Sequence, residues 1–258
     1  MYIVTKEMQA ETKKKGITIP GNLLTMNGDA KTVKGHKKGY LTGIMYMKPN
    51  HKICPSSKVA ECDKVCLFGA GRGQMHSTQN HRENKTLLFQ NFEQYFMIAL
   101  HSSIRRLLSR AKRMNLTPCV RLNGTSDIDW SSKLLDGKTI FEHFPDLQFY
   151  DYTKVPSNVR KARQFPNYHV TISFSSAYGF GKLLTQMMPY GNNIAVVFRG
   201  PLPKTFLGLP VIKGDETDLR FLDNDVILDR VVVGLTAKGK ARKDDIFVVD
   251  SNLIAIAA

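Results

Sequence analysis

The sequence predicts an α/β protein built on a mainly parallel β-sheet. From residue 40 onward, short apolar runs typical of buried strands alternate with segments of helical periodicity. The 258-residue length suits one domain of barrel size or two small ones, and we treat residues 21–258 as one domain. Residues 1–20 are lysine-rich and weakly apolar, so we expect them to form a flexible basic N-terminal arm.

The expected elements follow in chain order. Residues 40–47 (YLTGIMYM) form the first convincing strand, which Pro49 ends. Residues 76–114 form a long helical stretch with apolar side chains at spacings of three and four, in which Gln90 and Asn91 indicate a break. Further strands are expected at residues 118–122, 147–152, 168–174 and 193–198, with later strands at 209–212, 231–235 and 246–249 and short helices near 139–143 and 177–187.

Composition excludes two protein classes and favours one kind of partner. Apolar residues make up 42% of the chain, and no apolar run approaches the roughly 18 residues of a membrane span, so neither a disordered nor a membrane protein is expected. We see no secretory signal and expect a cytoplasmic protein. The net charge of +15 favours a polyanionic partner, most simply a nucleic acid or nucleotide, although a solvated basic surface would also explain it. The oligomeric state stays open.

The segment from Cys54 to Gly73 is the strongest candidate for a functional site. Three of the four cysteines, Cys54, Cys62 and Cys66, lie in this one loop, and a glycine-rich turn follows them. Thiolates are soft ligands that suit zinc or an iron–sulfur cluster. Three thiolates can hold three irons of a [4Fe–4S] cluster and leave the fourth iron open. The alternatives are a zinc site, with Cys119 or a neighbouring histidine as fourth ligand, or three cysteines that are merely close in sequence.

Polar side chains recur where the predicted strands end. Examples are Asp127 after the second strand, Lys154 after the third, Ser173 and Ser175 at the end of the fourth and Arg199 after the fifth. Because the carboxyl ends of parallel strands share one edge, we expect these residues to converge with the cysteine loop on a ligand site. The alternative is that loops are simply polar.

Several segments resemble an uncharacterised family encoded mainly by bacteriophages. The resemblance covers most of the chain after about residue 22, and it is carried by NGDAKTVKG, LTGIMYM, CPSSKVAECDKVCLFGAGRG, RLNGTSDIDW, FYDYTK, GDETDLRFLD and GLTAKGKARKDDIFVVD.

A more distant resemblance is to phage proteins related to radical S-adenosylmethionine (SAM) proteins. Those proteins have a C-x7-C-x2-C loop after the first strand, a Ser/Asp-rich turn after the second and a Thr-Lys pair after the third. Here the loop is C-x7-C-x3-C, and Thr153-Lys154 stands in the matching place. The resemblance implies a partial (β/α) barrel of about six mainly parallel strands, a [4Fe–4S] cluster on the three cysteines, and SAM as second cofactor.

The same resemblance implies roles for individual residues. It implies that the chain cleaves or binds SAM and acts on a nucleic acid or nucleotide. Cofactor binding is expected of Asn123, Gly124, Thr125, Ser126, Asp127, Ser173 and Ser175, and catalytic roles of Asp127, Lys154 and Arg199. The alternative function is a non-enzymatic nucleic-acid-binding phage protein with a structural zinc site, whose fourth ligand would be Cys119, His51 or His76.

Overall fold

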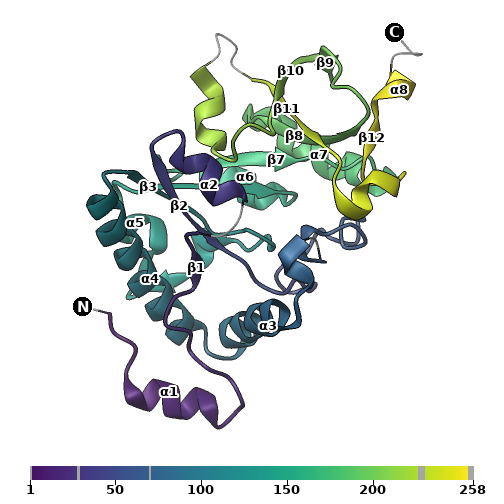
Figure 1. Ribbon diagram of the computed structural model, residues 1–258. Helices are drawn as coiled ribbons and strands as arrows, with labels where there is room; N and C mark the ends of the chain where they lie inside the picture. Colours follow the sequence, from purple (N-terminus) through teal and green to yellow (C-terminus); the bar gives the residue numbers. More distant parts are fainter. Residues whose placement is uncertain (1, 28–29, 70, 226–229, 255–258) are drawn as a thin grey trace.

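The computed structural model describes residues 2–27, 30–69, 71–225 and 230–254, and it has a mainly parallel sheet at its centre (Figure 1). Gly28 and Asp29, from the segment NGDAKTVKG, and Ala70, from the glycine-rich turn, lie outside these ranges. Seven parallel strands are neighbours in this order: β2 (Tyr40–Met45), β3 (Thr117–Arg121), β6 (Gln148–Thr153), β7 (Tyr168–Ser173), β8 (Ile194–Arg199), β11 (Val232–Thr236) and β10 (Leu209–Lys213).

Two-residue strands complete the sheet. β1 (Leu24–Thr25) pairs antiparallel with β2 at one edge, and β9 (Thr205–Phe206) pairs antiparallel with β10 at the other. β12 (Val249–Asp250) pairs with the last residues of β8. The sheet formed by the described residues is therefore open at both edges and is not a closed barrel. The prediction of an α/β protein with a mainly parallel sheet is confirmed.

α-Helices connect the strands and pack against the sheet. The long helical stretch is two helices, α3 (His76–Asn91) and α4 (Glu93–Met114), which meet at Phe92. The remaining α-helices are α1 (Lys6–Lys13), α2 (Ala30–His36), α5 (Ile140–His143), α6 (Pro156–Ala162), α7 (Gly181–Met187) and α8 (Ser251–Ile254). None of the helices in the described ranges is long and apolar enough to cross a membrane.

The two faces of the sheet differ in chemistry. Because side chains alternate along a strand, Val120, Phe149 and Ile172 point to one face, where they join the main apolar core with α4 and α6. The neighbouring positions on β3, β6 and β7 point to the opposite face, which is covered by α2 and the 3-10 helix η6 (Arg220–Asp225). We call this the polar face, and its members are Cys119, Arg121, Tyr150, Tyr152, His169 and Thr171.

The N-terminal segment carries more order than its lysine-rich composition predicts. Thr5 caps α1, with its Oγ1 accepting a hydrogen bond from the Met8 amide at 3.3 Å. Met8, Ile17 and Ile19 are buried in the main core. These few apolar side chains, spaced among lysines, are what tie residues 2–20 to the rest of the molecule.

Candidate functional site

The cysteine loop lies at the carboxyl-terminal edge of the sheet, and the loops that follow two strands hold it there. The Asp127 amide, after β3, donates to the Ile53 carbonyl at 2.7 Å. The Ser175 hydroxyl, after β7, donates to the Ala60 carbonyl at 2.7 Å. Two separate strand ends therefore position the loop that carries the thiols.

The three thiols of this loop are free, half-buried and close enough to influence one another. Burial raises the pKa of Cys54 to about 12, and the nearby Asp127 carboxylate and the other two thiols add to that rise. Burial likewise raises the pKa of Cys66. Among the residues that the structure describes, no three His, Cys, Asp or Glu side chains stand close enough together to hold a metal ion. The thiols would have to approach one another to share a metal.

Asp127 and Lys154 lie at the same edge as the thiols. Asp127 is buried, which raises its pKa, although it accepts hydrogen bonds from Thr153 Oγ1 (2.5 Å), the Lys154 amide (2.8 Å) and Asn158 Nδ2 (3.2 Å). The Lys154 ammonium donates to Ser173 Oγ at 2.6 Å. Its positive charge opposes the rise in the pKa of Cys54 described above.

A cavity of about 280 Å³ adjoins the first cysteine. Lys52 and Pro55, two residues before and one residue after Cys54, form part of its wall, and Asp127 and Asn158 form another part. The Asn158 Oδ1 atom is buried and has no hydrogen-bond partner among the described residues. This hollow beside the start of the cysteine loop thus has the Asp127 carboxylate and an unpaired Asn158 oxygen in its wall.

The loop after β3 uses most of its polar groups internally. Asn123 Oδ1 accepts from Ser126 Oγ (2.8 Å), the Ile128 amide (3.0 Å) and Trp130 Nε1 (3.1 Å). Thr125 Oγ1 donates to the Met47 carbonyl at 2.6 Å. These contacts organise the loop, so the side chains predicted to bind a cofactor are occupied in this structure.

The loop after β3 contains a glycine, Gly124, because its backbone passes very close to the backbone of β2. A Cβ atom at Gly124 would lie 2.4 Å from the Met45 carbonyl oxygen, closer than any real Cβ contact. Gly124 therefore lets the loop after β3 pack against the end of β2. In the glycine-rich turn, a Cβ at Gly73 would meet the Phe68 carbonyl at 2.3 Å, so that glycine serves a close contact within its own segment.

The remaining predicted residues also have partners. Arg199, at the end of β8, forms ion pairs with Asp245 (2.7 Å) and Asp250 (2.8 Å). Cys119 lies inside the sheet on the polar face, with its sulfur 3.4 Å from Thr42 Oγ1. The structure therefore places Cys119 with Thr42 instead of with the loop thiols.

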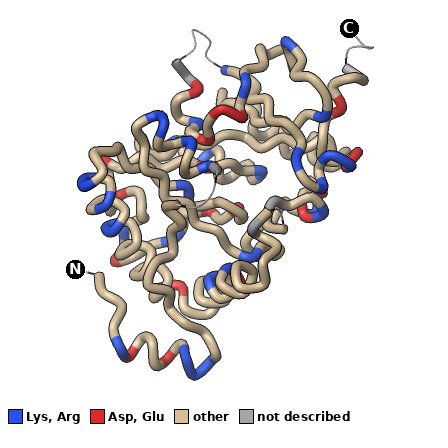
Figure 2. Tube along the Cα trace, in the orientation of Figure 1, with Lys and Arg blue, Asp and Glu red and all other residues tan. Residues whose placement is uncertain are grey.

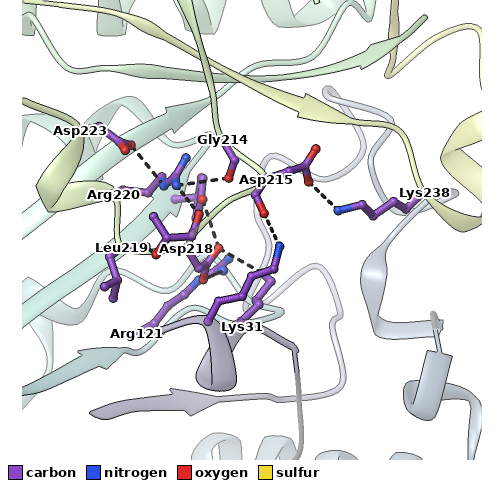
Figure 3. Close-up of polar contacts among 12 residues, drawn as sticks. Lys31, Arg121, Gly214, Asp215, Asp218, Leu219, Arg220, Asp223 and Lys238 are labelled. Atoms are coloured by element: carbon purple, nitrogen blue, oxygen red, sulfur yellow. Dashed lines mark hydrogen bonds and ion pairs between the residues drawn. The ribbon is translucent and has the colours of Figure 1, made fainter. Parts of the chain in front are cut away.

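Sequence reasoning missed a charged cluster on the polar face (Figure 3). Arg121 Nη1 lies 2.7 Å from Asp218 Oδ2, and Lys31 Nζ lies 3.5 Å from Asp218 Oδ1. Beside them, Arg220 Nε lies 3.2 Å from Asp223 Oδ2. We call these five residues the charged cluster. The available signal was the presence of Arg121, Tyr150 and Tyr152 at alternate positions within strands expected to be buried.

The charged cluster shifts the acidity of its members in opposite directions. Burial alone would raise the pKa of Asp218, but the positive charges of Arg121 and Lys31 lower it to about 2. Burial raises the pKa of Asp223 to about 6, against the attraction of Arg220. Asp218 is therefore a permanent anion, held between the segment that precedes η6 and the strand β3.

Comparison with known proteins shows the family of this chain. No curated protein and no solved structure matches it. A family model described as Gene product 88 matches residues 22–250, which is most of the chain. This match supports the bacteriophage-type family that the sequence resembles and adds nothing to the radical SAM resemblance. The chain belongs to the Gene product 88 family.

Proposed function

We propose that this protein is an iron–sulfur protein of the radical SAM type, which cleaves or binds SAM and acts on a nucleic acid or nucleotide. One observation carries the proposal. The three thiols of a single loop gather at the carboxyl-terminal edge of a parallel sheet, with Asp127 and Lys154 beside them. In sheets of this kind, ligand sites are built at that edge.

The chemistry of the donor set fits a cluster. Burial raises the pKa values of Cys54 and Cys66, so these thiols are costly to ionise alone, and a bound cation would offset that cost. A closed zinc site needs a fourth ligand. Cys119 pairs with Thr42, and the His51 ring nitrogen Nδ1 lies 3.4 Å from Ser57 Oγ. His76, the third candidate, is the first residue of α3. A three-thiolate site that leaves one iron open needs none of these three residues.

The strand order supports a partial (β/α) barrel. β2, β3, β6, β7 and β8 are neighbours in the order in which they occur in the chain, as in barrels, whereas doubly wound sheets reverse direction at a switch point. The polar face would then be the inner face of the partial barrel. α2 and η6 cover this face, so a substrate would enter at the carboxyl-terminal edge, where the thiols lie.

The residues at the edge have separable tasks in this proposal. When bound, the cluster and SAM would supply radical chemistry, which belongs to the cofactors. Lys154 holds a positive charge beside the thiols, where it would meet a carboxylate or phosphate. Asp127 fixes the backbone at Lys154 through the 2.8 Å hydrogen bond to its amide, and Ser175 holds the cysteine loop against β7.

The first test is the metal content of anaerobically purified protein. We expect about four irons and matching labile sulfide per chain, the content of a [4Fe–4S] cluster. Replacing Cys54, Cys62 or Cys66 by Ala should each abolish the iron, whereas the matched variant Cys119→Ala should keep it. Stoichiometric zinc without sulfide would overturn the cluster and favour the alternative with a structural zinc site.

The second test concerns the ammonium at the edge. Lys154→Ala should weaken the binding of SAM to the iron-loaded protein by roughly 1.5–3 kcal/mol, the scale of a charge-assisted hydrogen bond. Isothermal titration calorimetry measures this directly. Lys154→Arg keeps the charge and should retain most of the affinity. Equal affinity in the wild type and Lys154→Ala would contradict the role given to Lys154.

A further inference from the structure

A basic groove runs between the N-terminal segment and the helix α4. Its volume is about 810 Å³. Residues 2–4 and 19–22 form one wall, and α4 forms the other. It lies away from the cysteine loop in sequence and on a different set of elements. In Figure 2, basic positions gather along the helix labelled α4 in Figure 1.

Four arginines of α4 line the groove, and no acidic residue does: Arg105, Arg106, Arg110 and Arg113. Arg110 is half-buried, and the other three are exposed. None of the four forms an ion pair with an acidic side chain within the part of the chain that the structure describes. Their positive charges therefore face the groove without internal compensation.

The helix dipole does not explain this arrangement. Cations stabilise a helix only within its last turn, which for α4 contains Lys112 and Arg113. Arg105 and Arg106 lie two turns earlier. Arg106 and Arg110 are four residues apart on one side of the helix, and like charges at that spacing destabilise it by a few tenths of a kcal/mol. The groove thus retains a repulsion that an anionic ligand would relieve.

We propose that this groove binds the phosphodiester backbone of a nucleic acid, independently of base sequence. The nine residues from Arg105 to Arg113 span about 12 Å of helix, so a chain of phosphates can meet several guanidinium groups at once. Arginine favours phosphate because its fork of donors binds two oxygens together. The inference deepens the nucleic-acid part of the proposed function and does not depend on the cysteine site.

The groove has no free aromatic ring on which a base could stack, among the residues that line it. Its aromatic side chain, Tyr2, donates its hydroxyl to Asp136 at 2.7 Å and packs its ring edge-on against His101, with centroids 4.6 Å apart. That ring is engaged within the protein and is not a stacking platform for a base. Contacts to phosphates give affinity and orientation without sequence information.

The test measures binding of the full chain to short fluorescent oligonucleotides by polarisation over a series of salt concentrations. Single-stranded DNA, duplex DNA and RNA of the same sequence form the three arms. Each lost phosphate contact lowers the slope of log K against log salt by about 0.9 for a duplex and about 0.7 for a single strand. Arg106→Gln with Arg110→Gln should therefore lower the slope by roughly 1.4–1.8 and weaken binding at low salt at least tenfold.

The matched control is Lys204→Gln with Lys213→Gln, two exposed lysines near β9 and β10. It removes the same net charge and should leave the slope nearly unchanged. Equal losses in both double variants, or no binding of the wild type at low salt, would overturn the inference. Complete displacement of the oligonucleotide by an equal concentration of inorganic pyrophosphate would also overturn it, in favour of a small-anion site.

Measuring iron in the same variants distinguishes a failure of the groove proposal from a failure of the cysteine-site proposal. The arginine variants should contain as much iron as the wild type, since the groove shares no residue with the cysteine loop. Loss of oligonucleotide binding with unchanged iron supports the groove. Loss of iron in the cysteine variants with unchanged oligonucleotide binding would leave the groove standing, whatever the chemistry at the edge.

Discussion

Asp218→Ala should lower the free energy of unfolding by about 3–5 kcal/mol, because it leaves the buried Arg121 guanidinium without its counter-ion. The side chain of Arg121 is 7% exposed, and its Nη1 atom lies 2.7 Å from Asp218. Its Nε atom already has no hydrogen-bond partner among the described residues. The Tyr152 hydroxyl would lose its acceptor too. Urea denaturation at neutral pH measures the loss.

Two variants separate the buried pair from an ordinary ion pair. Asp215→Ala breaks the more exposed contact between Asp215 and Lys238, and it should cost at most about 1 kcal/mol. Replacing both Arg121 and Asp218 by Leu should recover much of the stability lost in Asp218→Ala, since neither charge is then left alone. A cost for Asp218→Ala no larger than that for Asp215→Ala would show that the cluster does not stabilise the fold.

Asp151→Asn should change how stability depends on pH. Asp151 is fully buried on the face of the sheet that carries the main apolar core. Its Oδ1 accepts a hydrogen bond from the Asn123 amide at 2.6 Å, and the Tyr168 hydroxyl donates to its Oδ2 at 3.1 Å. Burial raises its pKa to about 8, despite these hydrogen bonds. The folded state therefore keeps a proton that the unfolded chain releases near its ordinary pKa of about 4.

The sign of the effect follows from this proton. The contribution of Asp151 to stability is fully present below about pH 4 and is lost as the pH rises to about 8. A shift of about four units corresponds to roughly 5 kcal/mol. Asn cannot ionise, so the variant should gain stability relative to the wild type by up to that amount between pH 4 and pH 8.

Thermal and urea unfolding across this pH range provide the measurement. Asp146→Asn, which changes an exposed carboxylate, is the control and should track the wild type closely. If Asp151→Asn and the wild type keep a constant difference from pH 4 to pH 8, Asp151 is ionised in the folded protein and the prediction is wrong.

Elements with a local signal were predictable from the sequence. The strand at residues 40–45 is an apolar run bounded by Gly39 and Pro49, and the helix break lies at Phe92, next to the predicted Gln90-Asn91. The rule that sites form where parallel strands end also placed Asp127 and Lys154 at one edge with the cysteine loop. Each of these inferences used only neighbouring residues and the regular geometry of strands.

Features made by distant residues could not be predicted in this way. α2 was missed because AKTVKGH is short, basic and interrupted by glycine, and its position depends on contacts with β2. Asn123 was expected to bind a cofactor, yet its side chain is used by Ser126, Ile128 and Trp130. A sequence shows which polar groups are present, but only the folded chain shows which of them are already bonded.

The separation of Arg121 and Asp218 along the chain also has a consequence for folding during synthesis. Ninety-seven residues separate the two partners along the chain. At about 5–20 residues per second, Arg121 leaves the ribosome roughly 5–20 seconds before Asp218 does. During that interval the Arg121 guanidinium has no counter-ion, and burying an unpaired charge is costly, so we expect the polar face to stay open. The growing chain should therefore remain protease-sensitive until its last quarter emerges, and it should then fold in one late cooperative step.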